Sequence, residues 1–390
     1  MKILLISDAS GYMRGGVITE IKHLIIGLQS RGHQVALAID SVTPLKCDVQ
    51  HFLMTLQVGK LMRQQVAHAV SKFQPNIIHI VCMSSQGVIS LKPIINGYPW
   101  LLTIHSLPPH ERKLSLFHGN EKIHYFARSL RFGINSLGWR WVFMTIPSLE
   151  IIVHSKFVKD AATGKGALTD AVTIVALPME AEMASNDCAF KNLVLSNDTL
   201  KVTTVGGMAH TKGQHDVIKA MALLRNTVPR IIYNIIGEVR DISYLNYLKS
   251  LICEFKLSEK VMFYENIDDQ KKNEILSSTD VYIQPSHEEG FCFAFLEAAS
   301  LVPRIIGTDT GSIGKVCEHD IGAFLVSPSK PQQLANAILN LMAKELTSDL
   351  MQMRQQRLLN TFSVDVYLDA HETLYCNSLL AFKQTTKRKY

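Results

Sequence analysis

Short apolar segments alternate with amphipathic helical segments along nearly the whole chain. This alternation is typical of β-α-β units, because consecutive parallel strands need a crossover connection that is usually a helix. The expected strands of the first half are Lys2–Ser7, Gln34–Ile39, Ile77–Val81, Trp100–Ile104, Glu150–Val153 and Val172–Val175. Those of the second half are Val202–Val205, Ile231–Ile236, Val261–Tyr264, Val281–Gln284, Arg304–Gly307 and Ala323–Val326. The sequence therefore predicts an α/β fold built on parallel sheets.

Helical periodicity fills several of the intervals between these strands. Residues 17–31 predict a helix that ends at Gly32, with four apolar residues on one face: Ile21, Leu24, Ile25 and Leu28. Further helices are expected at residues 213–225, 241–255, 269–278, 292–300 and 331–343.

The chain has 390 residues, which favours two domains at about 100–200 residues each. Residues 180–198 contain two turn-forming triplets, Ser185-Asn186-Asp187 and Ser196-Asn197-Asp198. We place the boundary there, with a first domain over residues 1–185 and a second from residue 186. Open α/β sheets bind ligands at the carboxyl ends of their strands, so we expect a ligand in a cleft between the domains.

The net charge is +6, and its distribution is uneven. Residues 1–185 hold 18 Lys and Arg against 11 Asp and Glu, whereas the remainder holds 22 against 23. This excess is too sparse for a nucleic-acid binder. It indicates an anionic partner of the first half, although scattered solvated lysines explain it equally well.

The seven cysteines are widely spread and form no CxxC pair, which argues against a disulfide framework or a zinc site. The apolar run before Asp8 is too short for a signal peptide, and no window approaches 18 uninterrupted apolar residues. We therefore expect a cytoplasmic protein in which most of the thiols are buried and which has no transmembrane helix.

Two segments of the first half carry candidate binding residues. Gly15-Gly16 stands at the start of the first expected helix, where the backbone and the helix dipole favour a phosphate. His105 follows the strand Trp100–Ile104 and could hydrogen-bond a substrate at the ligand edge of the sheet. Both patterns also occur for structural reasons, the first as a tight turn and the second as a satisfied histidine.

The second half carries the more specific pattern. Lys212 follows the strand Val202–Val205 and the glycine pair Gly206-Gly207, where its ammonium could neutralise a diphosphate. Glu289 and Glu297 are eight positions apart, the first in a loop and the second in a helix. Between them, the amides of Gly290, Phe291 and Cys292 form a candidate anion site at the helix start. Carboxylates that flank a phosphate cradle suit a nucleotide sugar, whose hydroxyls can donate to them. A solvated Glu289 and a Glu297 paired elsewhere in the lobe remain the structural alternative.

Two other motifs are excluded, the first by residue type and the second by spacing. The HExxH pattern of metalloproteases would need histidine where Phe291 stands, and the segment Gly311–Lys315 is too short for a P-loop.

These features together resemble the retaining GT-B glycosyltransferases, specifically the family 4 group, over residues 2 to about 380. The resemblance rests on the glycine pair, the T-x-H that ends in His105, the strand with its lysine, the E-x7-E and three further segments: Gln74–His79, Gly322–Pro328 and Phe362-Ser363. It implies two Rossmann-like domains, an acceptor domain at 1–185 and a donor domain at 186–362. It also implies a terminal helix at 363–390 that crosses back onto the first domain.

The resemblance implies that the chain transfers a sugar from a nucleotide-diphosphate sugar with retention, without a metal or another cofactor. Glu289 would hold hydroxyls of the donor sugar, and Glu297 would hold the ribose. Lys212 would neutralise the diphosphate, and His105 would contact the sugar, so that His105, Lys212 and Glu289 form the catalytic set. Gly15, Gly16, Gly207 and the amides of Gly290, Phe291 and Cys292 would complete the donor site.

Three positions differ from the family pattern. Gly207 stands in place of an arginine on the phosphates, Lys315 in place of a carboxylate, and Met179-Glu180 in place of Asn-Gly. These differences motivate a second hypothesis, a degenerate GT-B protein that binds a ligand or partner without catalysis. A nucleotide-sugar epimerase of the same fold is a third, which the E-x7-E disfavours.

The sequence does not identify the acceptor, for which a glycan, a lipid-linked glycan and a small molecule stay open. Residues 112–141 mix arginines with Trp139 and Trp141. This mixture suits peripheral contact between the first domain and the inner face of the membrane, and it equally suits a helix packed on the sheet.

Overall fold

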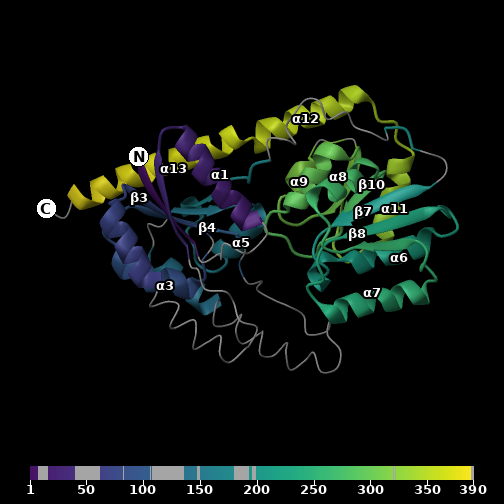
Figure 1. Ribbon diagram of the computed structural model, residues 1–390, viewed down its shortest axis with the longest axis horizontal. Helices are drawn as coiled ribbons and strands as arrows, with labels where there is room; N and C mark the ends of the chain where they lie inside the picture. Colours follow the sequence, from purple (N-terminus) through teal and green to yellow (C-terminus); the bar gives the residue numbers. More distant parts are fainter. Residues whose placement is uncertain are drawn as a thin grey trace. The chain divides into compact units, whose positions relative to one another are not determined.

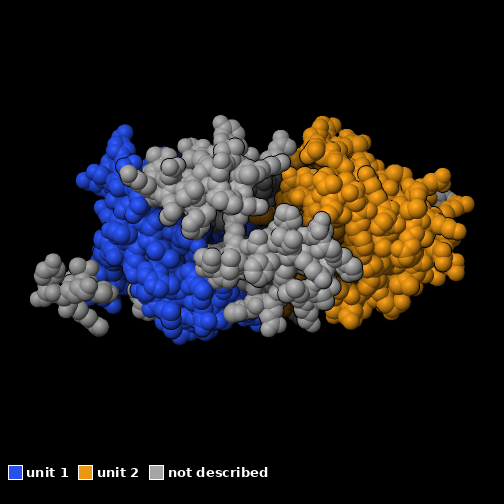
Figure 2. Space-filling view, turned by 90° about the horizontal axis from the view of Figure 1, so that it is seen from below, with its two compact units in different colours: residues 1–178, 364–390 blue, residues 179–363 orange. Residues whose placement is uncertain are grey.

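The computed structural model describes residues 1–7, 16–39, 62–81, 83–105, 107, 136–146, 150–179, 193–195, 199–318, 320 and 322–387. The chain divides into two compact units (Figure 2). Unit 1 consists of Met1–Pro178 and Val364–Tyr390, and unit 2 consists of Met179–Ser363. Each unit is built on its own parallel sheet, so the predicted α/β class is confirmed.

The sheet of unit 1 has six strands in the order β2-β1-β3-β4-β5-β6. Their bounds are β1 Lys2–Ser7, β2 Gln34–Ile39, β3 Ile77–Val81, β4 Trp100–Ile104, β5 Glu150–Val153 and β6 Val172–Ile174. Only β6 differs from the prediction, since it ends one residue earlier. The residues of the four inner strands β1, β3, β4 and β5 are almost all buried because helices cover the sheet, which explains their continuous apolar runs. The edge strands β2 and β6 are partly exposed.

Helices α1 (Gly16–Ser30) and α13 (Val364–Lys387) pack against each other in unit 1, and α3 (Ser85–Ile95) lies on the opposite side of the sheet (Figure 1). A right-handed crossover requires this arrangement, because β1–β2 and β3–β4 run in opposite directions across the sheet. The sequence did not predict α3, whose interior contains Pro93, or the short α5 (Lys156–Thr163). Residues 62–73 and 136–145 are also helical.

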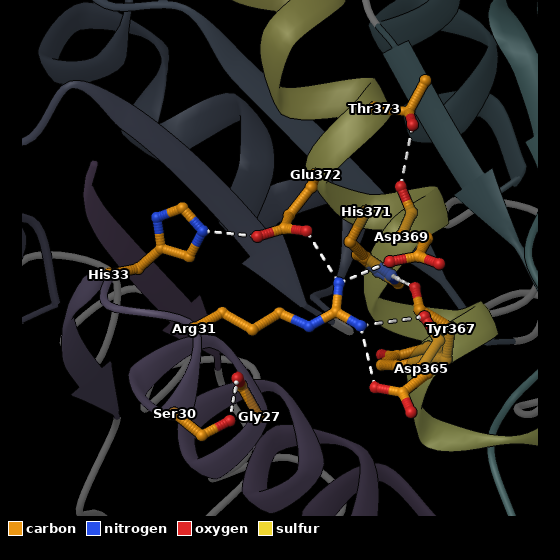
Figure 3. Close-up of polar contacts among 10 residues, drawn as sticks. All are labelled: Gly27, Ser30, Arg31, His33, Asp365, Tyr367, Asp369, His371, Glu372 and Thr373. Carbon is orange, nitrogen blue, oxygen red and sulfur yellow. Dashed lines mark hydrogen bonds and ion pairs between the residues drawn. The ribbon is translucent and has the colours of Figure 1, made fainter.

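The terminal helix α13 is tied to unit 1 by charge (Figure 3). The Arg31 guanidinium lies 2.9 Å from Asp365, 2.5 Å from Asp369 and 2.7 Å from Glu372. Glu372 also contacts Nε2 of His33 at 2.6 Å. His33 and Arg31 together hold the pKa of Glu372 below its usual value. These acids lie on one face of α13, so the helix presents a negative stripe to a single arginine.

The two tryptophans proposed for membrane contact, Trp139 and Trp141, differ in their exposure. Trp139 is 3% exposed, belongs to the core and stacks on Phe143 with ring centroids 5.6 Å apart. Trp141 is exposed, and the Lys92 ammonium lies 5.1 Å from its ring centroid. Trp139 is therefore a core residue and not part of a membrane-facing surface. The preceding residues 112–135 lie outside the described part of the chain. Among the described residues, no helix has the length and apolarity to cross a bilayer.

The sheet of unit 2 has six parallel strands in the order β12-β11-β10-β7-β8-β9. Their bounds are β7 Leu200–Val205, β8 Ile231–Ile236, β9 Val261–Tyr264, β10 Val281–Gln284, β11 Arg304–Thr308 and β12 Ala323–Val326. All six were predicted, with β7 beginning two residues earlier and β11 ending one residue later than expected.

Helices cover both faces of this second sheet. Figure 1 shows α6 (Gln214–Leu224) and α7 (Ile242–Glu254) on one side, with α8 (Asp269–Ser277) and α9 (Phe293–Leu301) on the other. α11 (Pro331–Met342) packs on α6. The short α10 (Ile313–Cys317) and the longer α12 (Ser348–Phe362) were not predicted. α12 has only a short buried stripe that includes Met351, Leu358 and Phe362, which leaves a weak apolar signal.

Candidate functional site

The chain reverses its direction across the second sheet between β7 and β10. From β7 it proceeds to β8 and β9 on one side, and from β10 it proceeds to β11 and β12 on the other. The loops that leave two such neighbouring strands diverge, which opens a crevice at the carboxyl ends where open α/β sheets bind ligands. The predicted lysine and the first predicted glutamate follow these two strands.

The loop after β7 is held against the loop after β10 by a close backbone approach. Gly213 has φ of +68°, and a Cβ at this position would lie 2.0 Å from the Pro285 carbonyl oxygen. Nearby, the His287 amide donates to the Thr211 carbonyl at 2.8 Å. Glycine is therefore required at residue 213, because any side chain would force the loops apart and carry Lys212 with them.

Lys212 and Glu289 meet at this point although they are 77 residues apart in the chain. The Lys212 Nζ donates to Glu289 Oε1 at 2.7 Å, and the Ser286 hydroxyl donates to the same oxygen at 2.7 Å. The Glu289 side chain is 8% exposed, whereas that of Lys212 is 20% exposed. The structure thus joins the two predicted residues in one ion pair whose lysine is accessible from solvent.

Glu297 has a different partner from Glu289. It lies in α9 and pairs with Nζ of Lys272 of α8 at 2.6 Å. Burial lowers the pKa of Lys272, but the Glu297 carboxylate outweighs this effect and the pKa is raised. Pairing with Lys272 supplies the partner that a nearly buried carboxylate needs.

The predicted amides Gly290, Phe291 and Cys292 precede α9 directly, and Cys292 is its N-cap. Cys292 has φ of +91°, a strained conformation for a residue with a side chain. Burial, and the nearby Glu289 carboxylate, raise the pKa of the Cys292 thiol well above its usual value. Ser312 fixes the loop, because its amide and hydroxyl donate to the Phe291 carbonyl at 3.0 and 2.6 Å. The loop is thereby rigid in front of the helix start.

His105 lies in unit 1 at the end of β4, and its Nε2 contacts Oε2 of Glu20. Glu20 is fully buried in α1, lies 3.3 Å from Nε2 of His154 and accepts the Tyr367 hydroxyl at 2.9 Å. Burial favours the neutral acid, but His105 and His154 outweigh it and hold the pKa of Glu20 well below its usual range. The other candidates on this side are Gly16, the first residue of α1, and Gly15, which lies outside the described residues.

Sequence analysis missed Glu20. The signal was present, because Glu20 precedes Leu24 by four positions and Leu28 by eight, which places it on the buried face of α1. A charged residue on that face must find a partner inside the fold. The motif histidine His79 likewise proves to be a core residue, bonded to the Tyr375 hydroxyl at 2.8 Å and the Thr103 hydroxyl at 2.7 Å.

Two groups within the described residues have the geometry to hold a metal ion. One is Glu20 with His105 and His154, and the other is His215 with Asp216 and His287. In the second group, Nε2 of His287 already contacts Asp216 Oδ2 at 2.7 Å. Hydrogen bonds and ion pairs within each group account for the same contacts without an ion, so neither is assigned as a metal centre.

Lys315 does not join the candidate site. It lies in α10 and pairs with Glu318 at 2.8 Å, with 61% of its side chain exposed. Gly311, by contrast, packs on the site: a Cβ there would lie 2.8 Å from Cβ of Glu289.

Two units, each with a parallel sheet and flanking helices, define the GT-B fold. The solved glycosyltransferase from Rickettsia africae superposes with a TM-score of 0.73 at 17% identity over 97% of this chain and 99% of that one. HepE from Anabaena, solved with UDP and glucose, superposes with a TM-score of 0.69 at 17% identity over 96% and 99%. At this identity the likeness shows the fold.

The sequence of unit 2 is similar to that of a known family. Residues 186–357 match the family Glycosyl transferases group 1. The capsular polysaccharide biosynthesis glycosyltransferase CapM of Staphylococcus aureus is 24% identical over 204 residues, which cover half of each chain. Together with the fold, these matches show that the chain is similar to the Glycosyl transferases group 1 family over residues 186–357.

Proposed function

We propose that this protein is a retaining glycosyltransferase that moves a sugar from a nucleotide-diphosphate sugar to an acceptor, without a metal. The observation that carries the proposal is the Lys212–Glu289 pair, 2.7 Å apart, at the switch point between β7 and β10. A cation and a carboxylate side by side match a donor that combines a diphosphate with sugar hydroxyls.

Each residue of the pair has a separate role in this proposal. The Lys212 ammonium has three donors, so it can bind phosphate oxygens and stabilise charge on the departing diphosphate. Glu289 accepts hydrogen bonds from sugar hydroxyls, and Ser286 holds its carboxylate in place. Glu297 binds the ribose, His105 contacts the sugar, and the amides before α9 approach the phosphates. Catalysis then rests on positioning and charge stabilisation.

The comparisons support a nucleotide sugar as the donor. HepE, which shares the fold, binds UDP, and CapM is a glycosyltransferase of capsular polysaccharide biosynthesis. By analogy we propose a glycan or lipid-linked acceptor for the present chain. The excess of Lys and Arg within residues 1–185 favours an acceptor with negative charge, and peripheral membrane contact through unit 1 in the cytoplasm belongs to the same proposal.

A donor panel tests the proposal. The purified protein is incubated with UDP-, GDP- and ADP-sugars and a mixture of glycan acceptors, and release of nucleoside diphosphate is measured. We expect release by the wild type and at least a roughly 30-fold loss for Glu289→Gln, because a charged site contact contributes about 2–4 kcal/mol. Glu259→Gln, which changes an exposed glutamate of unit 2, is the matched control.

Equal release by Glu289→Gln and the wild type would contradict the proposal. Nucleotide binding without turnover for any donor would instead favour the non-catalytic GT-B protein.

A further inference from the structure

Two cationic side chains lie over the two consecutive glycines that follow β7. A Cβ added to Gly206 would lie 3.9 Å from Cδ of Lys212, so the lysine stem passes over this residue. A Cβ added to Gly207 would lie 2.5 Å from Nε and 2.7 Å from Cδ of Arg240. Real Cβ atoms do not approach that closely. Arg240 therefore occupies its position only because residue 207 is a glycine.

The backbone fixes Arg240 in this place. Beyond the paired strands β7 and β8, the Met208 amide donates to the Glu238 carbonyl at 2.8 Å, and the Arg240 amide donates to the Met208 carbonyl at 3.2 Å. Met208 and Val239 also form a parallel β-bridge. The two loops thus continue the pairing of their strands, so that residue 240 is held beside residue 207.

Each of the two cations forms an ion pair with a different glutamate. Lys212 pairs with Glu289, and Nε of Arg240 pairs with Glu238 at 2.6 Å. The Arg240 and Glu238 side chains are 54% and 57% exposed, and an exposed ion pair of this kind contributes little to folding. The Arg240 pair is therefore weak enough for an anionic ligand to compete for the guanidinium.

We propose that Arg240 is a binding residue for the diphosphate of the donor, acting together with Lys212 above the Gly206-Gly207 backbone. This inference rests on the proposed function. A guanidinium presents parallel N–H donors that match two phosphate oxygens, whereas an ammonium acts as a compact point charge. Because the two glycines carry no side chains, both cations can lie close to the backbone at this place. The two cations together would then bind the negatively charged diphosphate.

Calorimetric titration with UDP, GDP and ADP tests the assignment. We expect Arg240→Ala to bind the preferred nucleoside diphosphate roughly 10- to 100-fold more weakly than the wild type, the effect of losing a hydrogen bond to a charged group. Arg225→Ala is the matched control, because Arg225 is an exposed arginine of unit 2 at the end of α6. It should bind within about twofold of the wild type.

Two further variants separate ligand binding from a structural role. Gly207→Ala keeps the arginine but displaces it, and we expect it to weaken binding in the same direction as Arg240→Ala. Glu238→Gln removes the competing carboxylate, so we expect binding equal to or tighter than that of the wild type. If Arg240 served only to pair with Glu238, Glu238→Gln and Arg240→Ala would change the unfolding midpoint alike and leave the dissociation constant unchanged.

The outcomes also distinguish this inference from the proposed function. Wild-type binding of a nucleoside diphosphate with an unchanged constant in Arg240→Ala would overturn the role of Arg240 and leave the glycosyltransferase proposal intact. Absence of binding by the wild type to all of UDP, GDP and ADP would overturn both.

Discussion

Glu20 in unit 1 and Glu289 in unit 2 are both nearly buried carboxylates paired with basic side chains, but their surroundings differ. Glu20 is fully buried among His105, His154 and Tyr367, which come from the sheet and from α13. Glu289 pairs with Lys212, one fifth of which is exposed. The carboxylate of unit 1 is thus enclosed by its partners, while that of unit 2 pairs with a lysine that solvent can reach.

Removing the Glu20 carboxylate should have the largest effect on stability, measured as the free energy of unfolding of unit 1. Glu20→Gln leaves two imidazoles without their anion, and breaking a buried ion pair costs about 3–5 kcal/mol. All three tryptophans (Trp100, Trp139 and Trp141) lie in unit 1, so tryptophan fluorescence during urea unfolding measures this unit. Asp170→Asn, an exposed acid of unit 1, is the control. An unchanged midpoint for Glu20→Gln would remove the structural half of the comparison.

Acid should destabilise unit 1 more steeply than unit 2. Burial lowers the pKa of His79 to about 3 and that of His371 to about 4 in unit 1, and that of His215 to about 3 in unit 2. Below about pH 6.5 the unfolded chain binds protons that these folded histidines do not, so stability falls with pH by up to about 1.4 kcal/mol per unit for each. Glu20 adds to the loss below about pH 4.3, where the unfolded carboxyl binds a proton that the folded one does not, and this loss continues until the pH falls through its lowered pKa.

Urea unfolding at several pH values checks this difference, with tryptophan fluorescence for unit 1 and far-ultraviolet circular dichroism for both units. Parallel loss of stability in the two units would argue against it.

Lys212→Ala should affect binding rather than folding. We expect roughly 10- to 100-fold weaker binding of a nucleoside diphosphate. We expect a smaller loss of stability than Glu20→Gln causes, because one fifth of Lys212 is exposed and the Ser286 hydroxyl still donates to Glu289. Lys249→Ala, an exposed lysine of α7, provides the control. A large loss of stability with unaltered binding would make the two carboxylates equivalent after all.

Arg31→Ala should weaken the attachment of α13 and lower the stability of unit 1 by less than Glu20→Gln does. The arginine faces three carboxylates, but Asp365 and Asp369 are 86% and 69% exposed, so solvent screens them. We expect a loss of about 1 kcal/mol that diminishes at high salt, measured by urea unfolding at low and high ionic strength. A loss that is independent of salt would mean that packing, not charge, attaches the helix.

Lys315→Ala should leave binding unchanged within about twofold, because this lysine is exposed and pairs with Glu318. Titration beside Lys212→Ala gives the sharpest contrast between two lysines of unit 2. Comparable weakening by both would place Lys315 in the donor site.

The strands could be predicted nearly to the residue because parallel strands covered on both faces are continuously apolar. The helices α3 and α12 could not, since Pro93 interrupts the first and the second has a narrow buried stripe. Within the site, the sequence predicted Lys212 and Glu289 as candidates. It did not predict Arg240, because nothing local to that residue shows which backbone lies beneath it.

The sequence by itself determined the α/β class, the positions of the strands along the chain and the residues that follow their carboxyl ends. Hydrophobic periodicity is local, so it can be recognised without the fold. Only the tertiary structure decided which of these residues meet, because sheet order brings β10 beside β7 and places a lysine against a glutamate 77 positions away. It also decided that Glu20 is enclosed by histidines and that Arg240 covers Gly207, since both depend on contacts between loops and helices distant in the chain.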